Sequence, residues 1–218
     1  MAIFSGPRIV ESGLIAHWDA SNMKSYPGTG TTWFDVSGQG VNTTLVNGTS
    51  YNSTNKTMVF DGVNDRCSSV TLPNPLGQLT CEVVMQYLPA AEYHNIFDRI
   101  VATPMFWIRP SSQFNRIELN TGNGLVSSVG YENQIIVATA MYRSDASPGL
   151  QLYINGNLVN TNNTIQSAWP NPFTITLFNR GGAQTYRGSI YSLKFYNRVL
   201  TANEVRQNFE AIRSRYGI

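Results

Sequence analysis

The acidic residues of the chain are spaced in a way that disfavours glycoside hydrolysis. Retaining glycosidases need two carboxyl groups about 5–5.5 Å apart, and same-face neighbours two positions apart on one strand supply that separation. None of the glutamates has an acidic residue two positions away. The glutamates are Glu11, Glu82, Glu92, Glu118, Glu132, Glu204 and Glu210. Carboxylates from different strands can still meet, so hydrolysis stays an alternative while the spacing predicts a protein that is not an enzyme.

Nucleophilic and zinc chemistry are disfavoured by the histidines and cysteines. His17 and His94 are the only histidines in the sequence, and neither lies in a nucleophile motif such as Gly-x-Ser-x-Gly. Together with two scattered cysteines, Cys67 and Cys81, they do not form a zinc pattern. Cys81 lies in a segment that reads as a core strand, so we expect free, buried thiols rather than a disulfide.

Two turn-rich segments carry the oxygen ligands that calcium prefers. Asp35 and Ser37 lie in "DVSG", and Asp61, Asn64 and Asp65 lie in "FDGVND". Hard cations bind carboxylate, amide and carbonyl oxygens in such loops. The same residue types also form turns by bonding their own backbone. The two segments therefore predict calcium binding, with simple turn formation as the alternative.

Aromatic residues in or beside loops predict sugar binding. Pyranose rings stack on aromatic faces, while amide side chains bond sugar hydroxyls. The candidate stacking residues are Tyr26, Trp33, Tyr93, Trp169 and Tyr186. The alternative is that these rings pack long loops, and Tyr26 and Trp33 lie in a turn-rich stretch, residues 22–40, that needs such anchors.

The elements that must position these residues read as short strands. "LTCEVVMQYL", residues 79–88, alternates apolar and other residues, and "QIIVATAMYR", residues 134–143, is apolar on both faces, as in a central strand. "LQLYINGNLV", residues 150–159, predicts a β-hairpin whose turn, Asn155-Gly156, has both residues at positive φ.

The period changes to that of a helix after residue 200. Thr201 and Glu204 have the spacing of a capping box, and Gly217 is a stop signal. An apolar face follows helical spacing through Val205, Phe209 and Ile212. One such helix after many strands predicts a lid on a sheet or on the end of a sandwich. The whole pattern predicts an all-β fold, a two-sheet antiparallel jelly-roll sandwich with one short C-terminal helix, in which residues 1–12 are an arm and residues 13–218 one domain.

Composition and charge argue against some classes of binding partner. Hydrophobic residues make up 42% of the 218-residue chain and charged residues only 13%, with a net charge of +2. This balance, without a run of basic residues, argues against nucleic-acid binding. No apolar stretch is long enough for a membrane span, and the first residues do not form a secretion leader, so we expect synthesis in a cytoplasm.

Three ordered motifs resemble one family. They are "GLIAHWDASNMKSYPGTGTTWFDVSGQGVNTTLVNG" with "MVFDGVNDRCSS", the hairpin "LQLYINGNLV", and "YRGSIYSLKFYNRVLTANEVRQNFEAIRSRYGI". In this order they look like a laminin-G-like, concanavalin A-like jelly-roll domain, of the kind found in tailed-phage virion proteins. Gln39 and Val41 depart from the family's Asp-x-Ser-Gly-x-Gly loop, which puts any ligand role of that loop in doubt.

The resemblance implies a function that composition does not show. It implies a non-enzymatic protein on the virion surface of a tailed bacteriophage, as capsid decoration or as a tail or neck accessory. The expected partners are other virion proteins, bound through the arm at residues 1–12, further copies of the chain on the particle, and cell-surface glycans. Relatives also hold calcium in similar loops. The alternatives are a free-standing lectin-like module and, third, a glycoside hydrolase.

Overall fold

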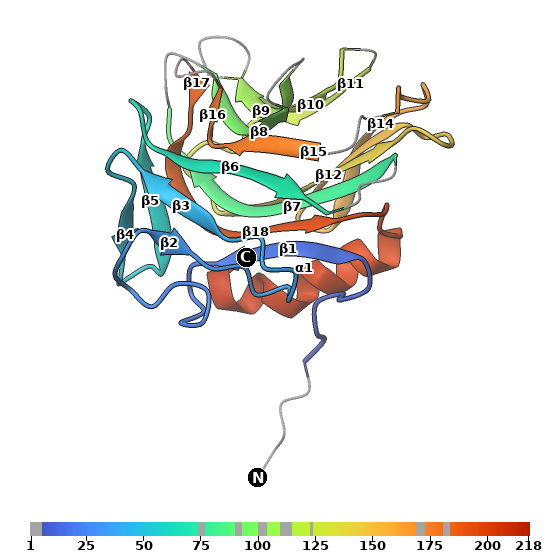
Figure 1. Ribbon diagram of the computed structural model, residues 1–218. Coiled ribbons are helices and arrows are strands. Elements are labelled where there is room, and N and C mark those ends of the chain that lie inside the picture. The colour runs from blue at the N-terminus through green and yellow to red at the C-terminus, as the bar shows by residue number, and fades with distance from the viewer. Residues whose placement is uncertain are drawn as a thin grey trace.

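The computed structural model describes residues 6–73, 77–89, 93–99, 104–109, 115–122, 124–168, 173–180 and 184–218. Two large antiparallel sheets lie face to face, and a single helix covers the outer side of one of them (Figure 1). We call the helix-bearing sheet the back sheet and the other the front sheet. Within the described residues the observed architecture confirms the predicted two-sheet sandwich with one C-terminal helix.

The back sheet follows the order β14-β13-β12-β7-β18-β5-β4, and β1 also pairs with β18. Its strands are β1 (Leu14–Asp19), β4 (Ser50–Asn52), β5 (Thr57–Asp61), β7 (Gln78–Tyr87), β12 (Ile136–Arg143), β13 (Leu150–Ile154), β14 (Asn157–Asn162) and β18 (Arg187–Tyr196). Two of the sequence predictions are confirmed here. β12 is a central strand, and β13 and β14 form the predicted hairpin, with φ of 49° at Asn155 and 78° at Gly156.

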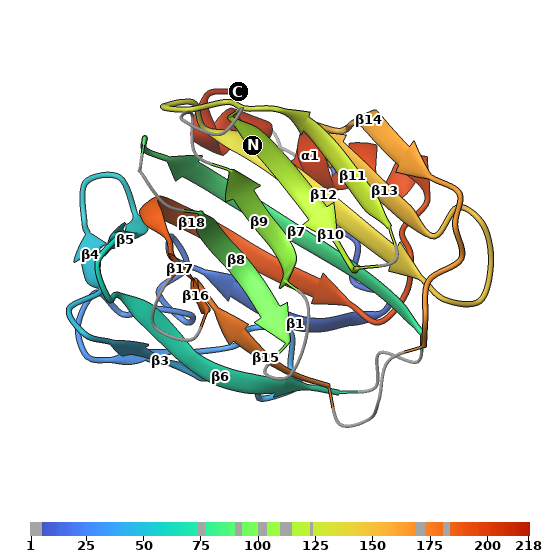
Figure 2. The same ribbon diagram turned by 90° about the horizontal axis from the view of Figure 1, so that it is seen from above.

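The front sheet follows the order β11-β10-β9-β8-β15-β6-β3-β2 and lies over the back sheet as a second layer, with strands β8 to β11 running in a similar direction to β7 and β12 (Figure 2). Its strands are β2 (Thr32–Trp33), β3 (Thr43–Val46), β6 (Arg66–Leu72), β8 (His94–Arg99), β9 (Pro104–Arg109), β10 (Arg116–Asn120), β11 (Leu125–Val129) and β15 (Phe173–Leu177). A small ribbon of β16 (Asn179–Arg180) and β17 (Gln184–Thr185) lies apart from both sheets in the pairing order.

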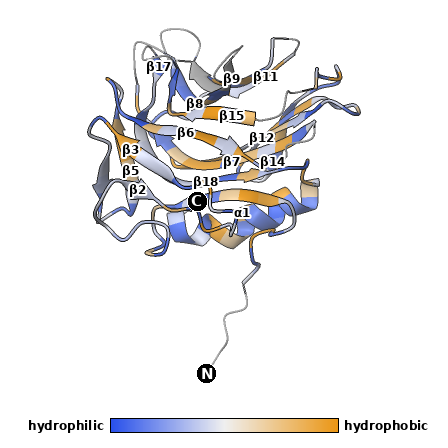
Figure 3. Cartoon of the chain, viewed as in Figure 1, coloured by the Kyte–Doolittle hydropathy of each residue, from blue (hydrophilic) through white to orange (hydrophobic). Residues whose placement is uncertain are grey.

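The main core fills the space between the sheets. On β7 the alternate residues Leu79, Cys81, Val83, Met85 and Tyr87 all belong to this core, as the alternation predicts. Figure 3 shows hydrophobic stretches along β6 and β15 and a helix of mixed character. Cys67 and Cys81 are free and buried, which confirms the predicted thiols, and burial raises the pKa of both.

Helix α1 (Ala202–Tyr216) packs on the outer face of the back sheet. Thr201 and Glu204 form the predicted capping box, and Gly217 ends the helix with φ of 70°. The apolar face of the helix, with Phe209 and Ile212, contacts sheet residues that point away from the main core, such as Val84. The back sheet is therefore covered on both faces. No helix in the described part of the chain is long and apolar enough to cross a membrane.

Residues 8–12, which we call the strap, lie against the domain itself. The Val10 amide donates to Asn208 Oδ1 at 2.8 Å, and the Tyr196 hydroxyl donates to the Val10 carbonyl at 3.1 Å. Arg198 Nε donates to the Ser12 carbonyl at 2.9 Å. The division into an arm, residues 1–12, and one domain stays a prediction, whereas the hydrogen bonds above hold residues 8–12 to the end of β18, to Arg198 and to α1.

Candidate functional site

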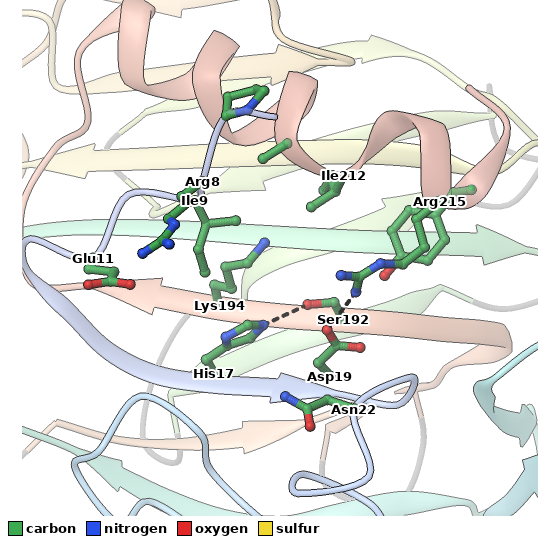
Figure 4. Close-up of a pocket in the computed structure, with 13 residues that line it drawn as sticks. Arg8, Ile9, Glu11, His17, Asp19, Asn22, Ser192, Lys194, Ile212 and Arg215 are labelled. Carbon is green, nitrogen blue, oxygen red and sulfur yellow. Dashed lines mark hydrogen bonds and ion pairs between the residues drawn. The ribbon is translucent and has the colours of Figure 1, made fainter. Parts of the chain in front are cut away.

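A pocket of about 320 Å³ lies where the strap, β1, β18 and the end of α1 meet (Figure 4). We call it the strap pocket. Its walls combine charged and polar side chains with a few apolar ones. It is lined by Pro7, Arg8, Ile9, Glu11, His17, Asp19, Asn22, Ser192, Lys194, Ala211, Ile212, Arg215 and Tyr216. Alternation along β1 and β18 points His17, Asp19, Ser192 and Lys194 to the same outer face, because each differs from the next on its strand by two positions.

Two ion pairs neutralise most of the charge around the strap pocket. Lys194 Nζ lies 2.6 Å from Glu82 Oε1, and both side chains are almost fully buried. Arg215 Nη1 lies 2.8 Å from Asp19 Oδ2 and also donates to Ser21 Oγ. Burial alone would raise the pKa of Asp19, but hydrogen bonds from Ser21 and the charge of Arg215 lower it overall. Asp19 is therefore ionised at neutral pH.

His17 and Ser192 form a close pair on the pocket floor. His17 Nε2 and Ser192 Oγ share a hydrogen bond of 3.2 Å, a distance suited to a base and a nucleophile. Burial and the charge of Lys194 lower the pKa of His17 to about 3, so the imidazole is neutral and a weak base. A general base works best with a pKa near the operating pH, and this imidazole lies far below it. His17 and Ser192 therefore have the geometry of a base and a nucleophile, but His17 binds a proton too weakly to act as an efficient base.

The low pKa of His17 predicts a dependence of stability on pH. In the unfolded chain His17 takes up a proton near its ordinary pKa of 6.5, whereas in the folded chain it does so near 3. The pKa of His94 is lowered in the same way, to about 4, by burial and by the positive charge of Arg187. Between pH 6.5 and 5 the unfolded state binds more protons, so stability falls as pH falls, with a slope approaching about 1.4 kcal/mol per pH unit for each histidine.

We expect His17→Gln to remove about half of that slope in urea unfolding measured at several pH values. Glutamine keeps a hydrogen-bonding group near Ser192 but does not titrate. His94→Gln is the matched variant and is expected to remove the other half. An unchanged slope in His17→Gln would show that His17 binds its proton equally well in both states.

A second pocket, of about 510 Å³, adjoins the first and shares Arg215 and Tyr216 with it. We call it the turn pocket, because the turn between β4 and β5 forms one wall. It is lined by Ser21, Thr54, Asn55, Lys56, Gln86, Ile135, Tyr191, Arg215 and Tyr216. The rings of Tyr191 and Tyr216 pack edge to face with centroids 5.1 Å apart. Hydroxyl, amide and ammonium groups thus surround a tyrosine pair on the outer face of the back sheet.

Three of the predicted sugar-stacking residues are buried, so the prediction is wrong for them. Trp33 and Tyr186 are 0% exposed and Tyr26 is 5% exposed, and all three belong to the main core. Tyr186 packs against Phe60 and Phe178, and the Tyr26 hydroxyl donates to the Gly30 carbonyl within its own loop. Tyr26 and Trp33 instead pack their long loop against the main core, which was the alternative to sugar binding.

Of the other two predicted aromatics, the structure describes only Tyr93. Tyr93 is half-buried immediately before β8, and it lines neither the strap pocket nor the turn pocket. Trp169 lies outside the described residues. The structure therefore does not gather the five aromatics into one surface cluster.

The predicted calcium ligands act mainly as turn formers. Both oxygens of Asp35 accept hydrogen bonds from its own neighbourhood, among them the amides of His17, Ser37 and Val41 and the Ser37 hydroxyl. Asp61 Oδ1 accepts from the Val63 amide. Within the described residues, no three His, Cys, Asp or Glu side chains gather in a way that could hold a metal.

The second calcium segment leaves one oxygen unsatisfied. Asp65 Oδ2 accepts from the Asp61 amide, whereas Asp65 Oδ1 is buried without a hydrogen-bond partner. Asn64 is exposed, and its carbonyl accepts from Asn47. Asp65 Oδ1 is the one atom of the predicted set that a cation would satisfy, and calcium binding stays a prediction.

Sequence reasoning missed the residues that line the two pockets. Lys56 follows an Asn/Ser/Thr-rich turn, Arg8 lies in the arm, and Arg215 is explained by the helix dipole. None of these positions carries a local signal, because the pockets are assembled from segments at both ends of the chain. Only the alternation along β1, which turns His17 and Asp19 away from the main core, indicated that these two residues could line a surface site.

Two stacked antiparallel sheets define the class of this protein as an antiparallel β-sandwich. Residues 68–206 match a laminin G family model described as the concanavalin A-like lectin/glucanases superfamily. This match spans more than half of the chain, so the protein belongs to that family. No curated protein matched the sequence.

Solved structures share the fold at low sequence identity. Trypanosoma rangeli sialidase in complex with the inhibitor DANA is 14% identical with a TM-score of 0.66, over 95% of this chain and 35% of the sialidase chain. The receptor-binding domain of botulinum neurotoxin C/D mosaic serotype is 15% identical with a TM-score of 0.67, over 92% and 52%. The binding domain of botulinum neurotoxin DC in complex with SialylT is 15% identical with a TM-score of 0.66, over 93% and 52%. The chain thus spans about a third to a half of these proteins, and the likeness shows the fold.

Proposed function

We propose that the protein binds glycans without cleaving them and does so on the surface of a tailed-phage particle. The observation that carries the glycan-binding part is the pair of open pockets on a lectin-family sandwich. Their hydroxyl, amide and charged groups lie beside the half-buried apolar side chains of Ile9 and Tyr216. Sugar sites combine these features, since apolar surface meets the ring and polar groups meet the hydroxyls. The neighbours include a toxin binding domain in complex with SialylT.

The acidic groups of the strap pocket support binding rather than hydrolysis. A glycosidase needs one carboxyl group with a raised pKa to protonate the leaving group. The pKa of Asp19 is lowered instead, and its carboxylate is held by Arg215 and Ser21. Glu11 lies on the opposite side of the pocket from Asp19, with His17 between them in Figure 4.

The resemblance of the sequence motifs to phage virion proteins is what supports the proposed location on a particle. Because the strap is bound by its own domain, attachment to capsid or tail proteins would use the residues that precede it. The strands β14 and β11, at the ends of their sheets, carry uncharged sequences and the exposed residues Leu158 and Val129. The two edges are joined to each other, since Asn160 Nδ2 of β14 donates to the Ser127 carbonyl of β11 at 2.7 Å. Contacts with further copies on the particle would therefore use these exposed side chains rather than free strand edges.

A glycan array tests the binding function. We expect binding to at least one class of glycan, and no release of reducing sugar when the same glycans are incubated with the protein. An array without binding would contradict glycan recognition, and sugar release would favour the hydrolase.

Deleting residues 2–6 tests the particle role, since it leaves the strap intact. We expect the shortened protein to fold with unchanged thermal stability but to be lost from purified particles. Full incorporation would contradict attachment through this arm, and absence of the full-length protein from particles would favour the free-standing lectin.

A further inference from the structure

We propose that the strap pocket and the turn pocket together bind an acidic oligosaccharide, whose sugar units carry carboxylate groups, with Arg8 and Lys56 as its cationic contacts. This inference rests on the proposed glycan-binding function and specifies the class of glycan. The two residues come from different pockets, so the ligand has to span both.

The first step is the charge that remains after the ion pairs are removed. Lys194 is matched by Glu82 and Arg215 by Asp19. The charged residues left in the two linings are Arg8, Lys56 and Glu11. All three are exposed, and within the described residues none forms an ion pair. The pockets therefore carry one net positive charge.

The second step is the wall that the pockets share. Arg215 is fixed through Nη1, which donates to both Asp19 and Ser21. A guanidinium group has five N–H donors in a planar fork, so this anchoring leaves further donors along the shared wall. The side chain is 49% exposed. A ligand that crosses from one pocket to the other passes this group, which suits oxygen-rich ligands and carboxylates above all.

The third step is the neutral surface beside the cations. In the turn pocket, Asn55 is exposed next to Lys56, and Gln86 is half-buried with its amide nitrogen bonded to the Asn133 carbonyl. Tyr216, which is half-buried, supplies apolar surface, and the buried Tyr191 packs behind it edge to face. Amide, hydroxyl and ring surface recognise a sugar, and the ammonium group of Lys56 adds the preference for an acidic one.

The fourth step is size. The pockets enclose about 320 and 510 Å³, each within the range of small-molecule sites. One sugar unit in each pocket, joined past Arg215, would place carboxylates near Arg8 and near Lys56. Two weak, exposed charge contacts on one ligand add their effects, although salt weakens both.

The test compares tetragalacturonate with its methyl ester, which has the same rings and hydroxyls but no charge. Sialyllactose with lactose is a second pair, with the carboxylate in another position. We expect the acid of at least one pair to bind at least tenfold more tightly than its neutral partner in calorimetry at low salt. We expect Arg8→Gln and Lys56→Gln each to weaken that binding at least threefold and to reduce its salt dependence.

Arg206→Gln is the control, since it makes the same charge change on α1 at a residue that lines neither pocket. It is expected to leave binding unchanged. Equal affinity for acid and neutral partner would overturn the acidic specificity and leave glycan binding standing. A preference for acids that survives in both pocket variants would overturn the assignment to these pockets. Failure to bind any glycan, charged or neutral, would contradict the proposed function itself.

Discussion

Replacing Lys194 by methionine is expected to lower the free energy of unfolding by about 3–5 kcal/mol, because it leaves the buried carboxylate of Glu82 without its counter-charge. Lys194 and Glu82 are 1% exposed each, and the Nζ–Oε1 distance is 2.6 Å. Asn208 Nδ2 donates to the other oxygen of Glu82 at 3.1 Å, which cannot by itself replace a full positive charge. Urea unfolding at neutral pH measures the loss.

A second substitution separates loss of charge balance from loss of packing. In the double variant Glu82→Gln, Lys194→Met the buried charge is gone, while the glutamine oxygen still accepts from Asn208. We expect the double variant to recover at least half of the lost stability. Arg206→Met, which breaks the exposed pair with Glu210, is the surface control and is expected to cost about 0.5 kcal/mol or less. Equal losses in the single and double variants would show that packing alone matters at Lys194.

Replacing Gly188 by alanine is expected to lower the free energy of unfolding by about 2–5 kcal/mol, from backbone strain and overpacking together. Gly188 lies in β18 between β5 and β7, with φ of 140°. A Cβ atom there would lie 2.2 Å from the Gln86 carbonyl oxygen and 2.9 Å from Tyr87 Cα. Both are backbone atoms of a central strand, so the clash is relieved only by moving the sheet.

Gly38→Ala is the matched control for backbone strain alone. Gly38 has φ of 90°, but a Cβ atom there would have nothing within 4 Å. Its expected cost is about 1–2 kcal/mol, the strain of the left-handed region by itself. Urea unfolding of both variants gives the difference. If Gly188→Ala lost no more stability than Gly38→Ala, the close approach of β7 to Gly188 would be refuted.

The parts of the fold that local sequence determines were predictable. Asn155-Gly156 specifies its own turn, and Thr201 with Glu204 caps the helix through atoms three residues apart. Alternation on β7 correctly assigned Glu82 to the face away from the main core. It did not predict that this face is buried, because the helix that covers it lies more than a hundred residues later in the chain.

The site was less predictable than the fold, for the same physical reason. Trp33 and Tyr186 lie in turn-rich segments, yet both rings fill the space between the sheets. Alternation and turn signals show which residues can face outward, not which segments meet. Arg8 and Lys56 line adjoining pockets that share Arg215 only because the strap, the β4–β5 turn and the helix end all lie beside β18.

The strap also determines when the domain can be completed during synthesis. Val10 and Ser12 bind Asn208, Tyr196 and Arg198, and β1 pairs with β18, so early residues of the domain wait for its late ones. The sequence separation at the Tyr196 and Arg198 contacts is 186 residues, which a ribosome spans in about 10–40 s at 5–20 residues per second. Until then the sheet residues that the helix covers, Val84, Val137 and Tyr191, stay open to solvent, and such transiently exposed apolar surface favours association. The strap and the helix therefore close the domain together, once β18 and α1 have both been made.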